Sequence, residues 1–146
     1  LADPVLGVTE MKRVVKPGGI IATYDWDVSG DGLPHEWLHK EFRKRGIDYP
    51  LPPSSDVSNI DKLEILWTKA GLRSLECKQI KVSRSFKNFE EFWDINASVQ
   101  AVTTVLDELS PQTVIEIRSN VERELDYDSN GSVTAHGHAN AIKGIV

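Results

Sequence analysis

The sequence has little cysteine and no long apolar run. Cys77 is the only cysteine among 146 residues, which excludes an internal disulfide framework and a zinc site built from several cysteines. A lone thiol is typical of a reducing compartment, so we expect a cytoplasmic protein in which Cys77 is a small core residue. No apolar run approaches the ~20 residues that cross a bilayer, so no membrane partner is expected.

The sequence also has fewer positively than negatively charged residues. The 17 Lys and Arg residues are outnumbered by 22 Asp and Glu residues, which gives a net charge of −5. A nucleic-acid surface needs a clustered basic face, so we expect no nucleic-acid partner. The hydrophobic content of 40% is ordinary for a globular protein, and the length fits a single domain over residues 1–146.

Residues 3–27 form the most informative stretch. Asp3 is a good helix N-cap, and Pro4 suits the first helical position. Lys16 and Pro17 predict the end of this helix, because a cation is favourable there and proline cannot continue it. Apolar residues recur between them at helical spacing, namely Val5, Val8, Met11 and Val15.

A short strand is expected next. Gly18-Gly19 allows a sharp reversal, and Ile20–Tyr24 is a run of strand-forming residues without polar alternation. We expect both faces of this strand to be covered, as in a parallel sheet. The residues D-W-D, 25–27, then follow at its carboxyl end, where ligands bind in open α/β sheets.

Two segments resemble class I S-adenosylmethionine-dependent methyltransferases, and in particular their UbiE-like branch. Residues 10–26 read E-M-K-R-V-V-K-P-G-G-I-I-A-T-Y-D-W. This segment is similar to the family's fifth strand and the helix that leads into it. Residues 67–72 read W-T-K-A-G-L, which is similar to the family's L-x-x-A-G-F pattern before the sixth strand. The resemblance implies a methyltransferase that uses S-adenosylmethionine and acts on a small molecule.

The family's cofactor motif is missing from this chain. In the family, a Gly-rich loop after the first strand and an acidic residue after the second hold the cofactor, whereas no G-x-G-x-G follows a strand here. The sequence starts at the helix that precedes the fifth strand in the family, without an initiating Met. The resemblance therefore implies a C-terminal portion that has no cofactor-binding residue and is inactive alone.

The remaining chain predicts further helices and two strands. Helices are expected around residues 33–45 and 59–70, and a strand over 73–86. Residues 88–126 read as helices, and residues 132–146 as a final strand. In the family the last strand is antiparallel and lies between the fifth and sixth. The expected fold is therefore α/β, a partial Rossmann-like sheet of late strands with a helical insertion at 88–126 that is a possible substrate lid.

A zinc-type motif, H-E-W-L-H, occupies residues 35–39. Two histidines one helical turn apart can bind zinc beside a catalytic glutamate. We do not expect zinc here, because no third ligand lies at a suitable spacing. His35 and His39 also avoid the apolar face that Leu38 and Phe42 define, so a solvated helix face explains them.

Two Asp-rich segments, residues 25–36 and 126–137, imitate calcium-binding loops. The first follows a strand rather than a helix, and Gly137 replaces the bidentate glutamate in the second. Asp-rich turns also form for local reasons. His136 and His138 lie on one side of the final strand, but two ligands make a poor site. We expect no metal, and keep a calcium-binding protein as the weakest alternative.

The candidate substrate-binding residues are Tyr24, Asp25, Trp26, Asp27 and Trp93. An aromatic ring with flanking carboxylates at a strand end can bind a cationic or hydroxylated substrate. The alternative is that Trp26 and Trp93 are core residues and that the aspartates cap the next turn. Methyl transfer depends mostly on orientation, so no motif identifies a catalytic residue.

A non-enzymatic alternative follows from the same strand. Without the family's fourth strand, Ile20–Tyr24 is an apolar sheet edge that can pair with another chain. This alternative predicts a self-associating α/β module, and we expect a homodimer.

Overall fold

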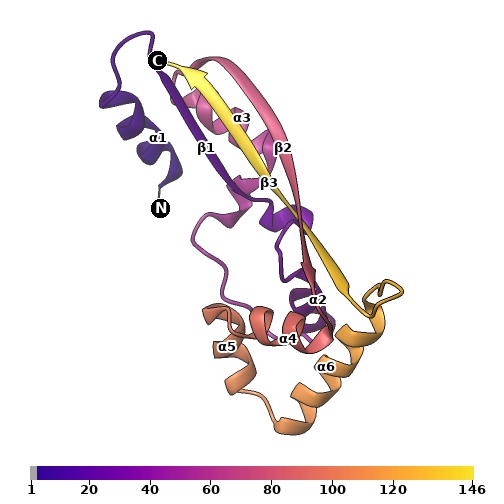
Figure 1. The fold of residues 1–146 in the computed structure, drawn as a ribbon. Coiled ribbons are helices and arrows are strands. Elements are labelled where there is room, and N and C mark those ends of the chain that lie inside the picture. Colours follow the sequence, from indigo (N-terminus) through magenta and orange to yellow (C-terminus); the bar gives the residue numbers. More distant parts are fainter. Residues whose placement is uncertain (1–2) are drawn as a thin grey trace. The chain divides into compact units, whose positions relative to one another are not determined.

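The computed structural model describes residues 3–146 (Figure 1). The chain alternates helices with three strands. In chain order the elements are α1 (Pro4–Arg13), β1 (Ile20–Trp26), η1 (Val28–Gly30), α2 (Glu36–Lys44), η2 (Ser55–Ser58), α3 (Ile60–Lys69), β2 (Arg73–Phe86), α4 (Phe89–Ala97), α5 (Gln100–Asp107), α6 (Pro111–Glu124) and β3 (Val133–Ile145). No helix of the described chain is both long enough and apolar enough to span a bilayer.

The strands form one sheet in the order β1-β3-β2. β3 runs antiparallel to β1, in a register that pairs Ile20 with Ile145 and Trp26 with Ala139. The last strand therefore lies between the two earlier ones and is antiparallel, as expected. β1 is an end strand of the sheet that residues 3–146 form.

The chain divides into two compact units. Residues 3–33, 52–82 and 137–146 form the first, here called the sheet unit, and residues 34–51 and 83–136 form the second, the helical unit. β2 and β3 each contribute residues to both units.

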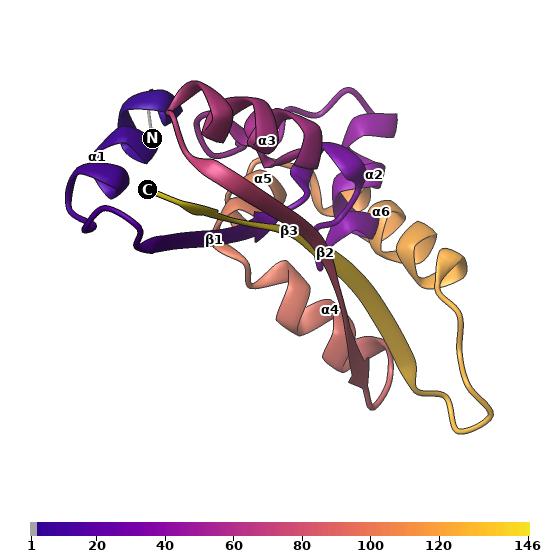
Figure 2. The same ribbon diagram turned by 90° about the horizontal axis from the view of Figure 1, so that it is seen from above.

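In the sheet unit, α1 and α3 pack on the same side of the sheet (Figure 2). The expected cap at Asp3 is confirmed, because the Leu6 N–H donates to Asp3 Oδ1 at 3.1 Å. Asn59 caps α3 by accepting from the Asp61 N–H at 3.0 Å. The buried core of this unit consists of Val8, Ile21, Leu63, Leu66, Trp67, Leu72 and Ile142.

The expectation that β1 is covered on both faces is wrong. Ile21 is buried, whereas Ile20 is 65% exposed and Tyr24 is 75% exposed. Within the sheet unit, the helices cover only the side to which Ile21 points, and the other face of β1 is open. The apolar run reflects its strand-forming residues rather than burial on two sides.

The helical unit has the larger core. Helices α4, α5 and α6 occupy residues 89–124, which confirms the expected helical segment between the last two strands. Asn88 caps α4 by accepting from the Glu91 N–H at 3.0 Å, and Ser110 caps α6. The buried core consists of Leu38, Phe42, Phe86, Phe89, Phe92, Trp93, Val102, Val105, Ile117, Val121, Leu125, Val133 and Ala135.

Two further expectations about burial are wrong. Cys77 is exposed rather than a core residue, because almost all of β2 is exposed around it. His39 is buried, together with Glu36 and Glu41, instead of lying on a solvated face of α2. The polar side of α2 is covered because Tyr49 packs against His39, with ring centroids 4.5 Å apart.

Candidate functional site

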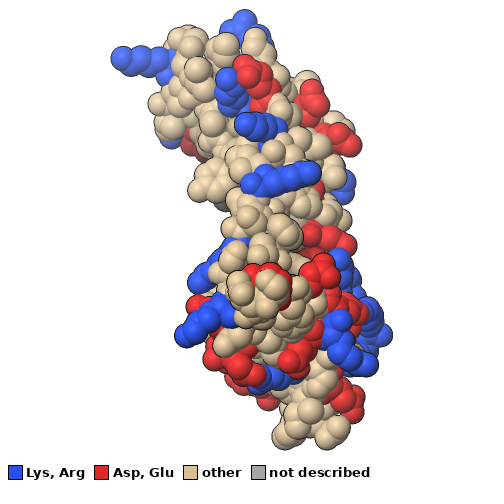
Figure 3. Space-filling view, turned by 45° about the vertical axis from the view of Figure 1, so that its right-hand side comes forward, with Lys and Arg blue, Asp and Glu red and all other residues tan. Residues whose placement is uncertain are grey.

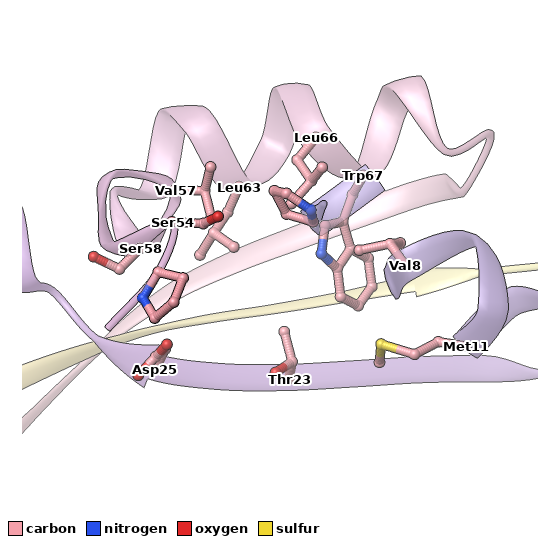
Figure 4. Close-up of a pocket in the computed structure, with 12 residues that line it drawn as sticks. Val8, Met11, Thr23, Asp25, Ser54, Val57, Ser58, Leu63, Leu66 and Trp67 are labelled. Atoms are coloured by element: carbon pink, nitrogen blue, oxygen red, sulfur yellow. The ribbon is translucent and has the colours of Figure 1, made fainter. Parts of the chain in front are cut away.

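A cavity of about 180 Å³ lies in the sheet unit beside β1 (Figure 4). Three parts of the sheet unit surround it: α1, β1, and the segment that runs through η2 into α3. Thr23 and Asp25 project into it from β1, since residues two apart on a strand share a face. The lining residues are Pro4, Val8, Met11, Thr23, Asp25, Pro53, Ser54, Val57, Ser58, Leu63, Leu66 and Trp67.

The walls of the cavity are apolar, and its polar groups lie near the carboxyl end of β1. Val8, Met11 and Trp67 contribute hydrophobic surface from two helices. Ser58 is held in place, because its Oγ donates to Ser55 O at 2.7 Å and accepts from the Val28 N–H at 3.0 Å. The arrangement fits a small molecule that has an apolar body and a polar end.

Asp25 supplies the charge of the cavity. Its Oδ1 accepts from the Trp26 N–H at 2.8 Å, and Oδ2 has no hydrogen bond within the described residues. A carboxylate with one free oxygen can accept a hydrogen bond from a hydroxyl or a cationic group. Among the five candidate residues, Asp25 is the one that lines this cavity.

Asp27 caps the turn that follows β1. It is 6% exposed, its Oδ1 accepts from the Gly30 N–H at 3.0 Å, and its Oδ2 lies 3.4 Å from His138 Nε2. This is the capping role foreseen as the alternative for the aspartates. A role of Asp27 in substrate binding stays a prediction.

Tyr24 and Trp26 line the open face of the sheet instead of the cavity. Both contribute to a hollow of about 420 Å³ with Asp25, Ile80, Val82 and Ala139, while Tyr24 also borders a second hollow of about 620 Å³. Tyr24 and Trp26 therefore lie on the face of the sheet opposite the cavity, whereas Asp25, near the end of β1, borders both the cavity and this hollow.

Trp93 belongs to the helical unit and packs in its core. The residue is 7% exposed, and its ring lies 6.1 Å from the Phe89 ring. The Arg118 guanidinium lies 5.6 Å from the Trp93 ring centroid, within cation–π range. Core packing was the alternative for Trp93, and its role in a substrate site stays a prediction.

A polar cluster at the start of α2 was missed by the sequence interpretation. Arg43 Nη2 donates to Glu36 Oε1 at 2.7 Å, and His39 Nδ1 lies 3.6 Å from Glu36 Oε2, which has no hydrogen-bond partner. His35 Nε2 lies 2.7 Å from the Tyr49 hydroxyl. Burial lowers the pKa of His35, and the nearby His39 lowers it further. Within residues 3–146, no three His, Cys, Asp or Glu side chains converge as metal ligands would.

A second charged cluster joins α2 to α6. Burial alone would raise the pKa of Glu41, but hydrogen bonds from Lys44, Asn120 and Arg45 lower it below its ordinary value. Lys44 Nζ donates to Glu41 at 2.8 Å, and Asn120 Nδ2 donates to it at 2.9 Å. In the lower half of the space-filling view, acidic and basic side chains are interspersed on the visible face (Figure 3).

No signal in the sequence identified the full cavity. The i, i+2 spacing of Thr23 and Asp25 was available, but the remaining walls come from segments whose arrangement only the fold defines. For the second cluster, the spacing of Glu41 to Lys44 and Arg45 could have indicated the ion pairs.

No family model matches the sequence, and no curated protein matches it. Solved structures that are similar include a protein of Bacillus halodurans described as a methyltransferase, at 17% identity and a TM-score of 0.43. The match covers 97% of this chain and 57% of that one. Phosphoethanolamine N-methyltransferase 2 of Haemonchus contortus, in complex with phosphomonomethylethanolamine and S-adenosylhomocysteine, gives 17% identity and a TM-score of 0.38.

The same nematode enzyme in complex with S-adenosyl-L-methionine gives 18% identity and a TM-score of 0.36. Both nematode matches cover 99% of this chain and 30% of the other. The chain thus spans between about a third and somewhat over half of the length of these methyltransferases. These likenesses are too distant to assign an activity.

Proposed function

We propose that the chain is the C-terminal part of a class I S-adenosylmethionine-dependent methyltransferase that acts on a small molecule. The observation that carries the proposal is the position of β3, which runs antiparallel between β1 and β2. The motif K-P-G-G at residues 16–19 leads into β1, as the resemblance requires. The sheet is then the late part of a Rossmann-like sheet, with α4–α6 as its helical insertion.

On this proposal, the cavity beside β1 holds part of the methyl acceptor. Its volume of about 180 Å³ limits the part enclosed to a small group. Asp25 orients a hydroxyl or cationic group of the acceptor, while Val8, Met11 and Trp67 exclude water from its apolar part. Roles for Tyr24, Trp26, Asp27 and Trp93 in substrate binding, and for residues 88–126 as a lid, stay predictions.

The proposal places the S-adenosylmethionine site outside the described residues. The turn after β1 carries Gly30 and Gly32, but a Cβ at Gly30 would lie 2.4 Å from Asp27 Oδ2. A Cβ at Gly32 would lie 2.4 Å from His138 O. These glycines therefore serve a tightly closed turn rather than a cradle for a cofactor. The parent protein would supply the cofactor site elsewhere, and the present chain would be inactive alone.

Calorimetric titration with S-adenosylhomocysteine tests the proposal on two samples, this chain and a product extended upstream of Leu1. We expect binding to the longer product alone. If neither sample binds, the methyltransferase proposal is wrong. If the short chain binds, the cofactor site has been placed wrongly.

Asp25→Asn in the extended product tests the cavity. It should weaken binding of the methyl acceptor and leave the affinity for S-adenosylhomocysteine unchanged. Asp56→Asn, an exposed carboxylate outside the cavity lining, is the matched control. Equal effects of the two variants would refute the role of Asp25.

Self-association is the second candidate, because β1 is an end strand with exposed apolar side chains. A stable homodimer in a sedimentation experiment would support it, and a monomer at high concentration would contradict it. Calcium binding stays the weakest alternative, since Asp128 Oδ1 already accepts from the Asn130 and Ser132 N–H groups of its own turn. The cytoplasmic location also stays a prediction.

A further inference from the structure

The cavity beside β1 carries a negative charge that has no counter-charge. Among the described residues that line it, Asp25 is the single charged one, and none is a lysine, arginine or histidine. Within the described chain no ion pair joins Asp25 to a cation. Lys62 of α3 pairs instead with Asp56, since its Nζ lies 3.4 Å from Asp56 Oδ2. The charge of Asp25 is therefore left for a ligand to compensate.

Two oxygen atoms at this end of the cavity lack a donor within the described residues. One is Asp25 Oδ2. The other belongs to Asn140, which lies directly opposite Asp25 in the β1–β3 ladder and on the same face. Asn140 Nδ2 donates to the main-chain oxygen of Ser58 at 2.9 Å, so Oδ1 is a buried acceptor without a partner. Asn140 is not itself a lining residue, and Ser58 Oγ already donates to Ser55 O. Neither residue compensates the charge of Asp25.

The charge of Asp25 decides which polar group of a ligand fits this end. A carboxylate or a phosphate would be repelled by Asp25. A hydroxyl group can donate one proton to the carboxylate, but it leaves the negative charge uncompensated. An ammonium group compensates the charge and has three donors and no acceptor. Its hydrogen bond to a carboxylate is also about twice as strong as a bond between neutral groups. The polar end of the cavity is therefore best matched by an ammonium group.

The apolar walls decide what the ammonium group is attached to. Asp25 lies at one end of the cavity, whereas Val8, Met11 and Trp67 lie toward the other end (Figure 4). A dry, apolar cavity of about 150 Å³ can hold benzene. The volume of about 180 Å³ found here therefore accommodates an alkyl chain of about four to six carbons. Such a chain would extend from Asp25 toward Trp67.

We propose that the cavity beside β1 binds a protonated alkylamine, with the ammonium group at Asp25 and the alkyl chain between α1 and α3. This inference rests on the function proposed above, because it names the chemical class of the methyl acceptor in that same cavity. A protonated nitrogen has no lone pair to take a methyl group. The ammonium group therefore anchors the acceptor, and another of its atoms is methylated.

Probes that share one alkyl chain and differ in their polar group test the inference on this chain. They are n-butylammonium, 1-butanol and butyrate. In NMR titrations, n-butylammonium should shift the signals of the Trp67 indole N–H and the Thr23 amide, and it should bind about 10-fold more tightly than 1-butanol. Butyrate should leave both signals unchanged. Equal affinities of the amine and the alcohol, tighter binding of butyrate, or no binding of the amine would each overturn the proposal.

Asp25→Asn is the matched variant, because it keeps the size of the side chain and removes its charge. The preference for n-butylammonium over 1-butanol should disappear in this variant. Asp56→Asn, at an exposed carboxylate outside the cavity lining, should retain the preference. If Asp25→Asn does not fold, ionic strength provides the second measurement. Between about 0.01 M and about 1 M salt, the unaltered chain should lose affinity for the amine and keep its affinity for the alcohol. A preference that survives Asp25→Asn, or that does not respond to salt, would overturn the proposal.

The outcomes separate this inference from the proposed function. If the product extended upstream of Leu1 binds S-adenosylhomocysteine while the cavity shows no preference for the amine, the function stands and the ligand class is refuted. If the cavity prefers the amine while the extended product does not bind S-adenosylhomocysteine, the amine site stands and the function is refuted.

Discussion

The sheet unit and the helical unit bury their side chains to very different extents. The helical unit places four aromatic rings, those of Phe86, Phe89, Phe92 and Trp93, in one core, and three pairs of them lie within 6.2 Å of each other. The sheet unit has a smaller core and leaves Ile20 and Tyr24 largely exposed on β1. The helical unit is therefore the more complete of the two as a folding unit.

The two units also differ in how they treat buried polar groups. In the helical unit, Glu36 and Glu41 are buried with charged partners, Arg43 and Arg45 among them. The sheet unit buries Asn140, whose Nδ2 donates to Ser58 O at 2.9 Å while Oδ1 has no partner. The helical unit therefore pairs its buried carboxylates with arginines, whereas the sheet unit places its buried Asp27 beside His138 and leaves one buried amide oxygen unpaired.

The largest effect is expected from Phe92→Ala in the helical unit. Phe92 is fully buried and contacts the rings of Trp37, Phe86 and Phe89. Removing a buried phenyl ring costs about 3–5 kcal/mol of unfolding free energy, which urea denaturation measures. Tyr24→Ala in the sheet unit is the control and should change stability by less than about 0.5 kcal/mol. Equal losses would contradict the difference between the units.

A smaller loss is expected from Gly32→Ala in the sheet unit. The added Cβ would lie 2.4 Å from the main-chain oxygen of His138 and 3.0 Å from Asp27 Cβ. The turn would have to move, and overpacking of this kind costs about 1–3 kcal/mol. Ser29→Ala is the control for Gly32→Ala. A glycine such as Gly46 would not serve as the control, because its φ of 66° is itself strained for alanine. Thermal unfolding followed at Trp67 would measure the change, and an unshifted transition would show that the turn is not closed as described.

Local signals predicted most of the secondary structure. Asp3 with Pro4 begins a helix where the sequence indicated, because a cap acts on the first turn that follows it. The helices expected around residues 33–45 and 59–70 are also present, as α2 and α3. The position of the last strand followed from the resemblance and is confirmed by its pairing with β1. These features depend on a few neighbouring residues or on a recognisable motif.

Burial was predicted less well, because it depends on partners distant in sequence. His39 is covered by Tyr49, and Glu41 bonds to Asn120 of α6, contacts that the periodicity of α2 does not encode. The cavity beside β1 likewise draws its walls from three parts of the sheet unit. Cys77 was assigned to the core on its residue type alone, although β2 is exposed around it.

Glu41→Gln should reduce the acid sensitivity of the helical unit. The pKa of Glu41 is lower in the folded state than its ordinary value of 4.5. Its contribution to stability is therefore complete above about pH 4.5 and is lost as the pH falls through the folded-state pKa. The wild type should lose stability in that range, and Glu41→Gln should lose less, from a starting point lower by about 1–2 kcal/mol. Parallel curves of stability against pH would refute this, with the exposed Glu10→Gln as control.

The smallest effect concerns His35, again in the helical unit. Its pKa is lowered below the ordinary 6.5 by burial and by His39, so the folded state favours the neutral imidazole that contacts Tyr49. The stability that this provides is complete above pH 6.5 and is lost as the pH falls through the folded-state pKa. NMR titration of the imidazole should give a pKa below 6.5. His35→Gln should flatten the stability curve below pH 6.5 without affecting the sheet unit. His136→Gln is the control in a strand position. A His35 pKa at or above 6.5 would show that this side chain is not held in its neutral form, and the helical unit would then owe its acid sensitivity to its carboxylates alone.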